Sequence, residues 1–234
     1  MSDIAHHLQQ VEAQIANAAR QAQRSPEEIL LLAVSKTKPL SAIREAYAAG
    51  QRRFGESYAQ EAALKVQAAK AEGLDIEWHF IGPLQSNKTR LVAEHFDWVD
   101  SVDRLKIAER LNEQRPESAQ PLQVCIQVNI SGESQKSGTT ETAVFDLARA
   151  ISQLPRLQLR GLMAIAENTS DERVIQRSFS QLHDLFVQMH ETFPSMDTLS
   201  MGMTHDYWIA VEEGANEIRV GSALFGARDY TLKF

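Results

Sequence analysis

Short runs typical of β-strands alternate with helical patterns along almost the whole of this chain of 234 residues. The runs that predict strands span 29–34, 52–56, 76–81, 97–102, 122–130, 157–165, 197–202 and 216–221. Apolar residues recur at helical spacing between them, for example over 41–50, 140–154 and 170–193, and a further helix is predicted over 3–22. Such alternation implies parallel strands that are joined by right-handed crossovers.

The number of strands favours a closed barrel. Eight strand–helix units in a chain of this length match a (β/α)8 TIM barrel, which typically needs ~250 residues. A doubly wound open sheet is the alternative, but it would normally use fewer strands. No linker rich in Gly, Pro or Ser divides the chain, so we expect one domain over residues 1–234. Ser41 and Gly50 are the predicted cap and stop of the helix over 41–50.

Composition and charge exclude several classes of function. A net charge of -7 leaves no basic surface for nucleic acid. No apolar run is long enough to span a membrane, and the N-terminus lacks the pattern of a signal peptide. The single cysteine, Cys125, rules out an internal disulfide framework, so we expect a cytoplasmic protein. An anionic ligand would need a local pocket, because the overall charge opposes it.

Polar and small residues gather where the predicted strands end. Ligands of such barrels bind at the C-terminal ends of the strands. The residues at these ends include Lys36, Ser57, His79, Asn129, Met163, Ser200, Gly202, Arg219 and Gly221. We therefore expect a binding site at this mouth, although His79 is equally well explained as a buried core histidine.

Lys36 follows the first strand and is the most informative of these residues. Strand periodicity places it on the same face as Leu32 and Val34, so it points into the barrel. Desolvation there would lower the pKa of its ammonium group, and a neutral amine attacks carbonyl groups to form a Schiff base. The alternative is a structural ion pair with Glu56 or Asp100 at the rim.

A phosphate site is predicted at the loops that follow the seventh and eighth strands, where barrels of this type often bind phosphate. Gly202 and Gly221 would let the backbone approach an anion, and Ser200, Thr204 and Ser222 offer hydroxyl groups. The alternative is that these are ordinary turns with capping residues. The histidines show no spacing typical of metal ligands, so no metal site is expected.

Several motifs together resemble one known family. They are LLAVSKTKP, FGESYAQE, EWHFIGPLQSNK, VNISGESQKSG, RGLMAI, LSMGM and IRVGSALFGARDY, which span residues 31–230. These stretches closely resemble the YggS/PROSC family of pyridoxal-phosphate-binding proteins. The resemblance implies the barrel of the alanine racemase N-terminal type, with pyridoxal 5'-phosphate in Schiff-base linkage to Lys36.

The resemblance also implies roles for other residues. It places Arg219 beside the pyridine nitrogen, and it assigns phosphate contacts to the segments with Ser200, Thr204, Gly221 and Ser222. This chain departs from the family pattern at Ser57, where Asn is usual. It also departs in the turn MTHD and in the residues Tyr207 and Trp208 that follow this turn.

The function implied is vitamin B6 homeostasis, namely binding and buffering of pyridoxal phosphate and its delivery to apo-enzymes that require it. Arg219 stays protonated and would oppose protonation of the pyridine nitrogen, which makes the ring a poor electron sink. We therefore expect no turnover, no catalytic residue and a monomer. The alternative is an amino-acid racemase or lyase of low activity that depends on the same cofactor.

Overall fold

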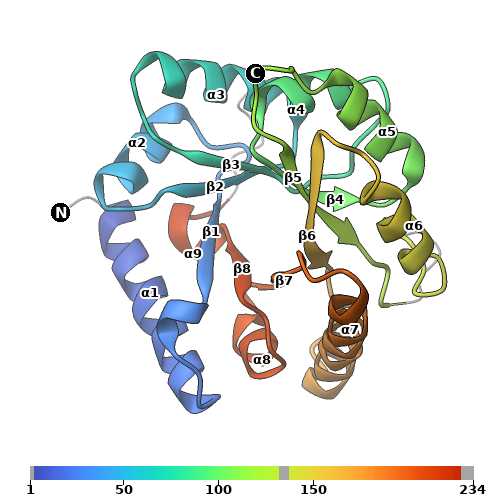
Figure 1. Cartoon of the computed structure of the whole chain (residues 1–234). Helices are drawn as coiled ribbons and strands as arrows, with labels where there is room; N and C mark the ends of the chain where they lie inside the picture. The colour runs from blue at the N-terminus through green and yellow to red at the C-terminus, as the bar shows by residue number, and fades with distance from the viewer. Residues whose placement is uncertain (1–2, 132–136, 228–234) are drawn as a thin grey trace.

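Parallel strands close into a barrel in this computed structural model, and helices surround them (Figure 1). The structure describes residues 3–131 and 137–227. The strands are β1 (Leu30–Val34), β2 (Arg53–Glu56), β3 (Glu77–Phe80), β4 (Trp98–Val102), β5 (Leu122–Gln127), β6 (Leu157–Met163), β7 (Thr198–Met203) and β8 (Glu217–Val220). Each strand pairs with the next in chain order, and β8 pairs with β1. The predicted (β/α)8 barrel is thereby confirmed, and the open-sheet alternative is excluded.

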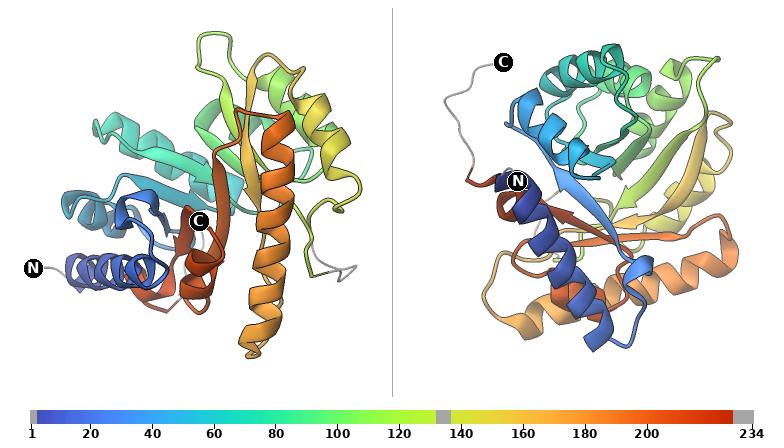
Figure 2. Two further views of the ribbon diagram at one scale, coloured as in Figure 1. Left: turned by 60° about the horizontal axis from the view of Figure 1, so that its bottom comes forward. Right: turned by 90° about the vertical axis from the view of Figure 1, so that its left-hand side faces the viewer.

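A helix follows each strand on the outside of the barrel, and further helices precede β1. They are α1 (Asp3–Gln21), η1 (Pro26–Glu28), α2 (Leu40–Ala48), α3 (Ala59–Ala71), α4 (Thr89–His95), α5 (Leu105–Gln114), α6 (Val144–Ile151), α7 (Glu172–Thr192), α8 (Tyr207–Glu212) and α9 (Ser222–Phe225). The extra N-terminal helix α1 packs against α2, α8 and α9, beside the point where the barrel closes (Figure 2).

Burial on both faces explains the apolar strands. Every residue of β4 and β8 is buried, because one face of each strand points into the barrel and the other contacts helices. Polar residues on the inner face therefore lie in a dry interior. This interior is the floor of the site described below.

Two local predictions about α2 had different outcomes. The helix begins at Leu40 with Pro39 at the capping position, so the prediction that Ser41 is the cap is wrong. Proline is compatible with this position because its fixed φ suits a helix start and its missing N–H is not needed, although its preferred position is the first helical residue. Gly50 lies just beyond the last helical residue with a φ of 112°, as expected of a stop.

Some sequence predictions lie outside the described residues. They concern the loop over 132–136 after the fifth strand and residues 228–230 of the last motif. Among the helices of the described ranges, none combines the length and the apolar character that crossing a membrane requires.

Candidate functional site

A cavity of about 250 Å³ opens at the C-terminal ends of the strands. The predicted site residues that line it are Lys36, Ser57, Thr204, Arg219, Gly221 and Ser222. A larger open groove of about 420 Å³ lies beside the N-terminal ends of β1 and β2, but it contains none of the predicted residues. The chemistry expected from the sequence therefore belongs to the cavity at the mouth.

The cavity is positively charged although the chain as a whole is acidic. Lys36, Lys38 and Arg219 all line it, and none of its described lining residues is Asp or Glu. The net charge of the chain is -7. A concave site with one sign of charge concentrates ligands of the opposite sign, so this mouth suits an anion.

Lys36 lies in a turn at the end of β1. The strand ends at Val34, and the backbone N–H of Lys38 donates to the Ser35 carbonyl over 3.0 Å. Val34 and Lys36 both line the cavity, as the strand periodicity predicts.

The carboxylates considered as alternative partners of Lys36 bind other groups. Glu56, at the end of β2, accepts a hydrogen bond from Lys65 of α3 at 2.9 Å. Asp100 lies 3.0 Å from Nδ1 of His79, inside the barrel. Each of these carboxylates is fully buried with its partner.

Arg219 extends from β8 into the wall of the cavity. Its Nη1 donates to the Ser200 hydroxyl at 2.8 Å, and its Nη2 donates to the Ala164 carbonyl at 2.9 Å. Burial lowers the pKa of this guanidinium, and the carboxylates of Glu217 and Asp100 oppose that effect. Because arginine does not deprotonate in proteins, the structure fixes a permanent cation at this position.

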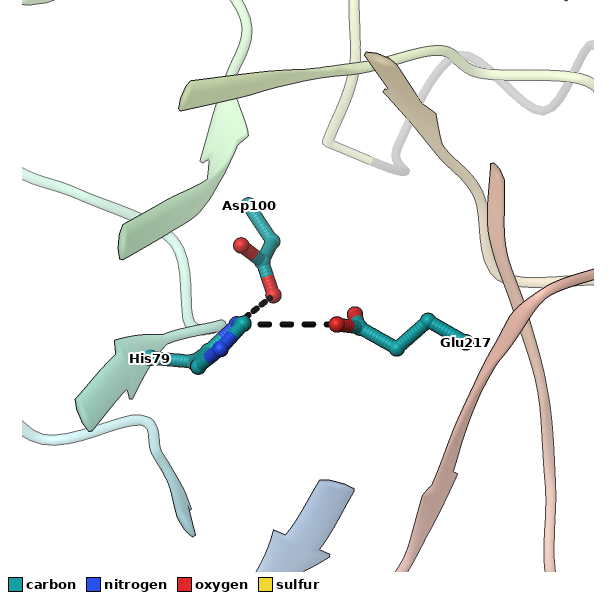
Figure 3. A group of neighbouring side chains, drawn as sticks. All are labelled: His79, Asp100 and Glu217. Carbon is teal, nitrogen blue, oxygen red and sulfur yellow. Dashed lines mark hydrogen bonds and ion pairs between the residues drawn. The ribbon is translucent and has the colours of Figure 1, made fainter. Parts of the chain in front are cut away.

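His79, Asp100 and Glu217 form a network of buried side chains inside the barrel (Figure 3), and both carboxylates act electrostatically on Arg219. Nδ1 of His79 lies 3.0 Å from Asp100 and 3.7 Å from Glu217, and the ring stacks on Trp98 with 4.9 Å between centroids. Burial alone would lower the pKa of His79, but Asp100 and Glu217 outweigh it and the pKa is raised to about 10. Burial raises the pKa of Glu217 to about 7.

The donor atoms of His79, Asp100 and Glu217 lie within 4.8 Å of one another, a spacing that could hold a metal ion. Protonated His79 and Arg219 provide positive charge beside Asp100 and Glu217, and Nε2 of His79 also lies 3.3 Å from Glu77. We therefore interpret the group as an ion network that supports Arg219. The pairing of these three residues was not predicted from the sequence, although polar residues inside three otherwise apolar strands were the available signal.

Other predicted site residues lie below the cavity wall or beside it. Ser200 is buried, and its hydroxyl accepts from Arg219 and also acts to lower the pKa of Glu217. Met163 packs against Trp98 and Cys125 in a small apolar cluster. None of these side chains lines the cavity at the mouth.

Asn129 lines a neighbouring cavity of about 200 Å³, which shares Ile81 and Ile165 with the first. Gly202 has a φ of 94°, and a Cβ there would come within 2.6 Å of the Ala210 Cβ. It lies within β7, where the pairing with β8 is irregular, and it leaves room for α8. His79, in the network described above, does not line the cavity either.

Hydroxyl groups from two loops meet at one side of the mouth. The Thr204 and Ser222 hydroxyl oxygens lie 3.4 Å apart, although they come from the loops after β7 and β8. A Cβ on Gly221 would approach the Val34 carbonyl oxygen to 3.2 Å, so a larger residue would crowd the mouth. This side of the cavity has the donors that a phosphate group requires.

The positions that depart from the family pattern have different surroundings. Ser57 lines the cavity. Tyr207 and Trp208 begin α8, where their rings are 5.5 Å apart, and neither lines the cavity. The side chain of Asp206 accepts the backbone N–H of Met203 at 2.5 Å and shapes the turn before α8.

Comparisons with known proteins agree with this geometry. Residues 7–229 match the family model described as alanine racemase, N-terminal domain. A pyridoxal phosphate homeostasis protein of Vibrio alginolyticus is 54% identical over 233 residues, which are 99% of this chain and 100% of the relative. The protein of the same name from Escherichia coli K12 is 53% identical over the full length of both chains. The structure of PipY from Synechococcus elongatus with PLP bound has a TM-score of 0.84 at 40% identity, over 96% of this chain and 100% of PipY.

Proposed function

Because the chain belongs to the family of pyridoxal phosphate homeostasis proteins, with the barrel of the alanine racemase N-terminal domain, we propose that it binds pyridoxal 5'-phosphate. The binding site is the cavity at the C-terminal ends of the strands. The observation that carries the proposal is that Lys36, Arg219 and the hydroxyl pair of Thr204 and Ser222 share this one cavity.

The residues of the cavity fit the chemistry of this cofactor. When bound, pyridoxal phosphate supplies an aldehyde that condenses with an amine and releases one water molecule. Lys36 is the proposed amine, and the hydroxyls of Thr204 and Ser222 are the proposed donors to the phosphate. The neighbouring Lys38 donates from Nζ to the Ala227 carbonyl at 2.5 Å. Strand periodicity, which places Lys36 on the same inner face as Val34, supports Lys36 for the linkage.

Arg219 supports the role of a carrier over that of a catalyst. Its cation is held by Ser200 and the Ala164 carbonyl, and we propose that it lies beside the pyridine nitrogen. A permanent positive charge there opposes protonation of the ring and weakens it as an electron sink. The proposed function is therefore vitamin B6 homeostasis, by binding and buffering the cofactor and delivering it to apo-enzymes, without turnover.

We also propose a domain organisation, an oligomeric state and a location for the protein. We place the whole chain of residues 1–234 in one cofactor-binding domain and expect a cytoplasmic monomer. Support comes from the full-length match to relatives and from the single buried cysteine, Cys125.

A spectral titration tests the proposed binding. Addition of pyridoxal phosphate to the purified protein should produce the visible absorption band of a Schiff base, and Lys36→Ala should lose the band while keeping its fold. An unchanged spectrum of the cofactor on addition of the native protein would reject the linkage.

The alternative is a racemase or lyase of low activity, which the match to the alanine racemase domain favours. The experiment is incubation of the loaded protein with L-alanine in deuterated buffer, followed by NMR. We expect no exchange of the α-proton. Steady exchange would identify the protein as an enzyme.

A further inference from the structure

Helix α3 carries an ion pair that is buried against the end of β1. The Lys65 Nζ lies 2.5 Å from Glu61 and 2.9 Å from Glu56, and all three side chains are buried. Burial raises the pKa of Glu56, and Lys65 opposes this shift. Because burying such charges has a large desolvation penalty, a group of this kind is weak evidence for added stability and suggests another role.

Lys65 and Glu61 are both hydrogen-bonded to the backbone next to Lys36, one on each side of it. Lys65 donates to the carbonyl oxygen of Ser35 at 2.9 Å. Glu61 accepts the backbone N–H of Thr37 at 2.8 Å. The peptide units before and after Lys36 are thus held by one helix, through two charged side chains that bond each other.

The turn that these bonds hold is strained. Thr37 has a φ of 62°, and this left-handed conformation is unusual for a β-branched residue. Such a conformation is unfavourable in isolation and persists only where the surroundings enforce it. The hydrogen bond from the Thr37 N–H to Glu61 is an enforcing contact, and Thr37 directly follows Lys36.

We propose that Glu61 and Lys65 are positioning residues that fix the direction in which the Lys36 side chain enters the cavity. The inference rests on the function proposed above, in which Lys36 forms the Schiff base. Fixing both flanking peptides sets the Cα–Cβ direction of Lys36, from which a long flexible side chain must reach the aldehyde. Displacement of a reacting group by about 1 Å can slow a reaction by roughly 100-fold.

The test compares two ligands that differ only in the reacting group. Pyridoxal phosphate condenses with Lys36, forming one C=N bond and releasing one water molecule. Pyridoxamine 5'-phosphate has the same ring and phosphate but carries an amine, so it binds without this condensation. The variants are Glu61→Ala and Lys65→Met, with Lys70→Met as the control because Lys70 is an exposed lysine of the same helix.

In both variants we expect Schiff-base formation to slow by at least about tenfold while the affinity for pyridoxamine phosphate stays within about twofold. The control should match the native protein for both ligands. Glu61→Gln should lie between native and Glu61→Ala, because an amide oxygen still accepts the Thr37 N–H but loses the charge that attracts Lys65.

Two results would overturn the positioning role. One is condensation at the native rate in folded Glu61→Ala. The other is an equal loss of affinity for both ligands, which would indicate damage to the whole cavity. A native protein that binds both ligands and forms no Schiff base would instead reject the proposed role of Lys36, and with it this inference.

Discussion

Thr204 and Ser222 are the two residues whose hydroxyls are proposed to bind the phosphate, and the contribution of each to the binding free energy can be measured separately. If their hydroxyls bind the phosphate, Thr204→Ala and Ser222→Ala should each weaken binding of pyridoxal phosphate by on the order of 1.5–3 kcal/mol, the value of a hydrogen bond to a charged group. Binding of pyridoxal, which lacks the phosphate, should stay unchanged, and both affinities can be measured by fluorescence titration.

A matched control for these variants is Ser118→Ala, at an exposed position distant from the cavity in the sequence. It should bind both ligands as the native protein does. Equal affinity of the native protein for pyridoxal and its phosphate would show that the loops after β7 and β8 do not form a phosphate site.

Strand periodicity predicted the direction of the Lys36 side chain, whereas the role of each site residue toward the cofactor stays a prediction. Lys36 and Arg219 both line the expected cavity. Ser200 was expected at the phosphate, but the structure shows its hydroxyl bonded to Arg219 below the cavity. That contact joins β7 and β8, and no pattern within either strand reveals it.

At the scale of elements, the pairing of β6 with β7 depends on a glycine. A Cβ on Gly161 would lie 1.7 Å from the carbonyl oxygen of its partner Thr198, which is backbone and cannot move without opening the sheet. We predict that Gly161→Ala lowers the free energy of unfolding by about 3 kcal/mol or more. Urea denaturation of the cofactor-free protein measures this change.

Gly55 in β2 is the matched control. A Cβ there would meet only the ends of the Leu32 and Ile81 side chains, at 3.1 and 3.2 Å. These side chains can shift by a few tenths of an ångström, so Gly55→Ala should cost clearly less than Gly161→Ala. Equal losses would contradict the explanation by close backbone approach.

The elements themselves were largely predictable from the sequence. All eight strands lie within or close to their predicted ranges, because a parallel barrel buries both faces and gives short apolar runs. The Glu61–Lys65 pair was not predictable, since charges four residues apart normally mark an exposed helix face. Only the packing of α3 against the end of β2 and the turn after β1 shows that this pair is buried.

At the scale of the whole molecule, the network at the centre of the barrel couples stability to pH. The pKa of His79 is raised from its ordinary 6.5 to about 10, because Asp100 and Glu217 outweigh the effect of burial. The folded protein therefore holds this proton when the unfolded chain has lost it. The stabilisation is complete below pH 6.5 and is lost as the pH rises to about 10.

We predict that replacing His79 by Gln makes the free energy of unfolding of the cofactor-free protein less dependent on pH between 6.5 and 10. The measurement is urea denaturation across this range, and the quantity compared is the slope, whatever the absolute stability of the variant. His183→Gln, at a partly exposed position of α7, should keep the native slope. Parallel curves for native and His79→Gln would refute the network as the origin of the effect.

We propose that Lys36, in one positively charged cavity, holds pyridoxal phosphate covalently. Lys36 and Lys38 both line that cavity, two residues apart. The decisive measurement is reduction of the loaded protein with borohydride, followed by proteolysis and fragmentation mass spectrometry that separates the two positions. We expect the reduced phosphopyridoxyl group on Lys36 alone. A group on Lys38, or on any lysine outside the cavity, would contradict it.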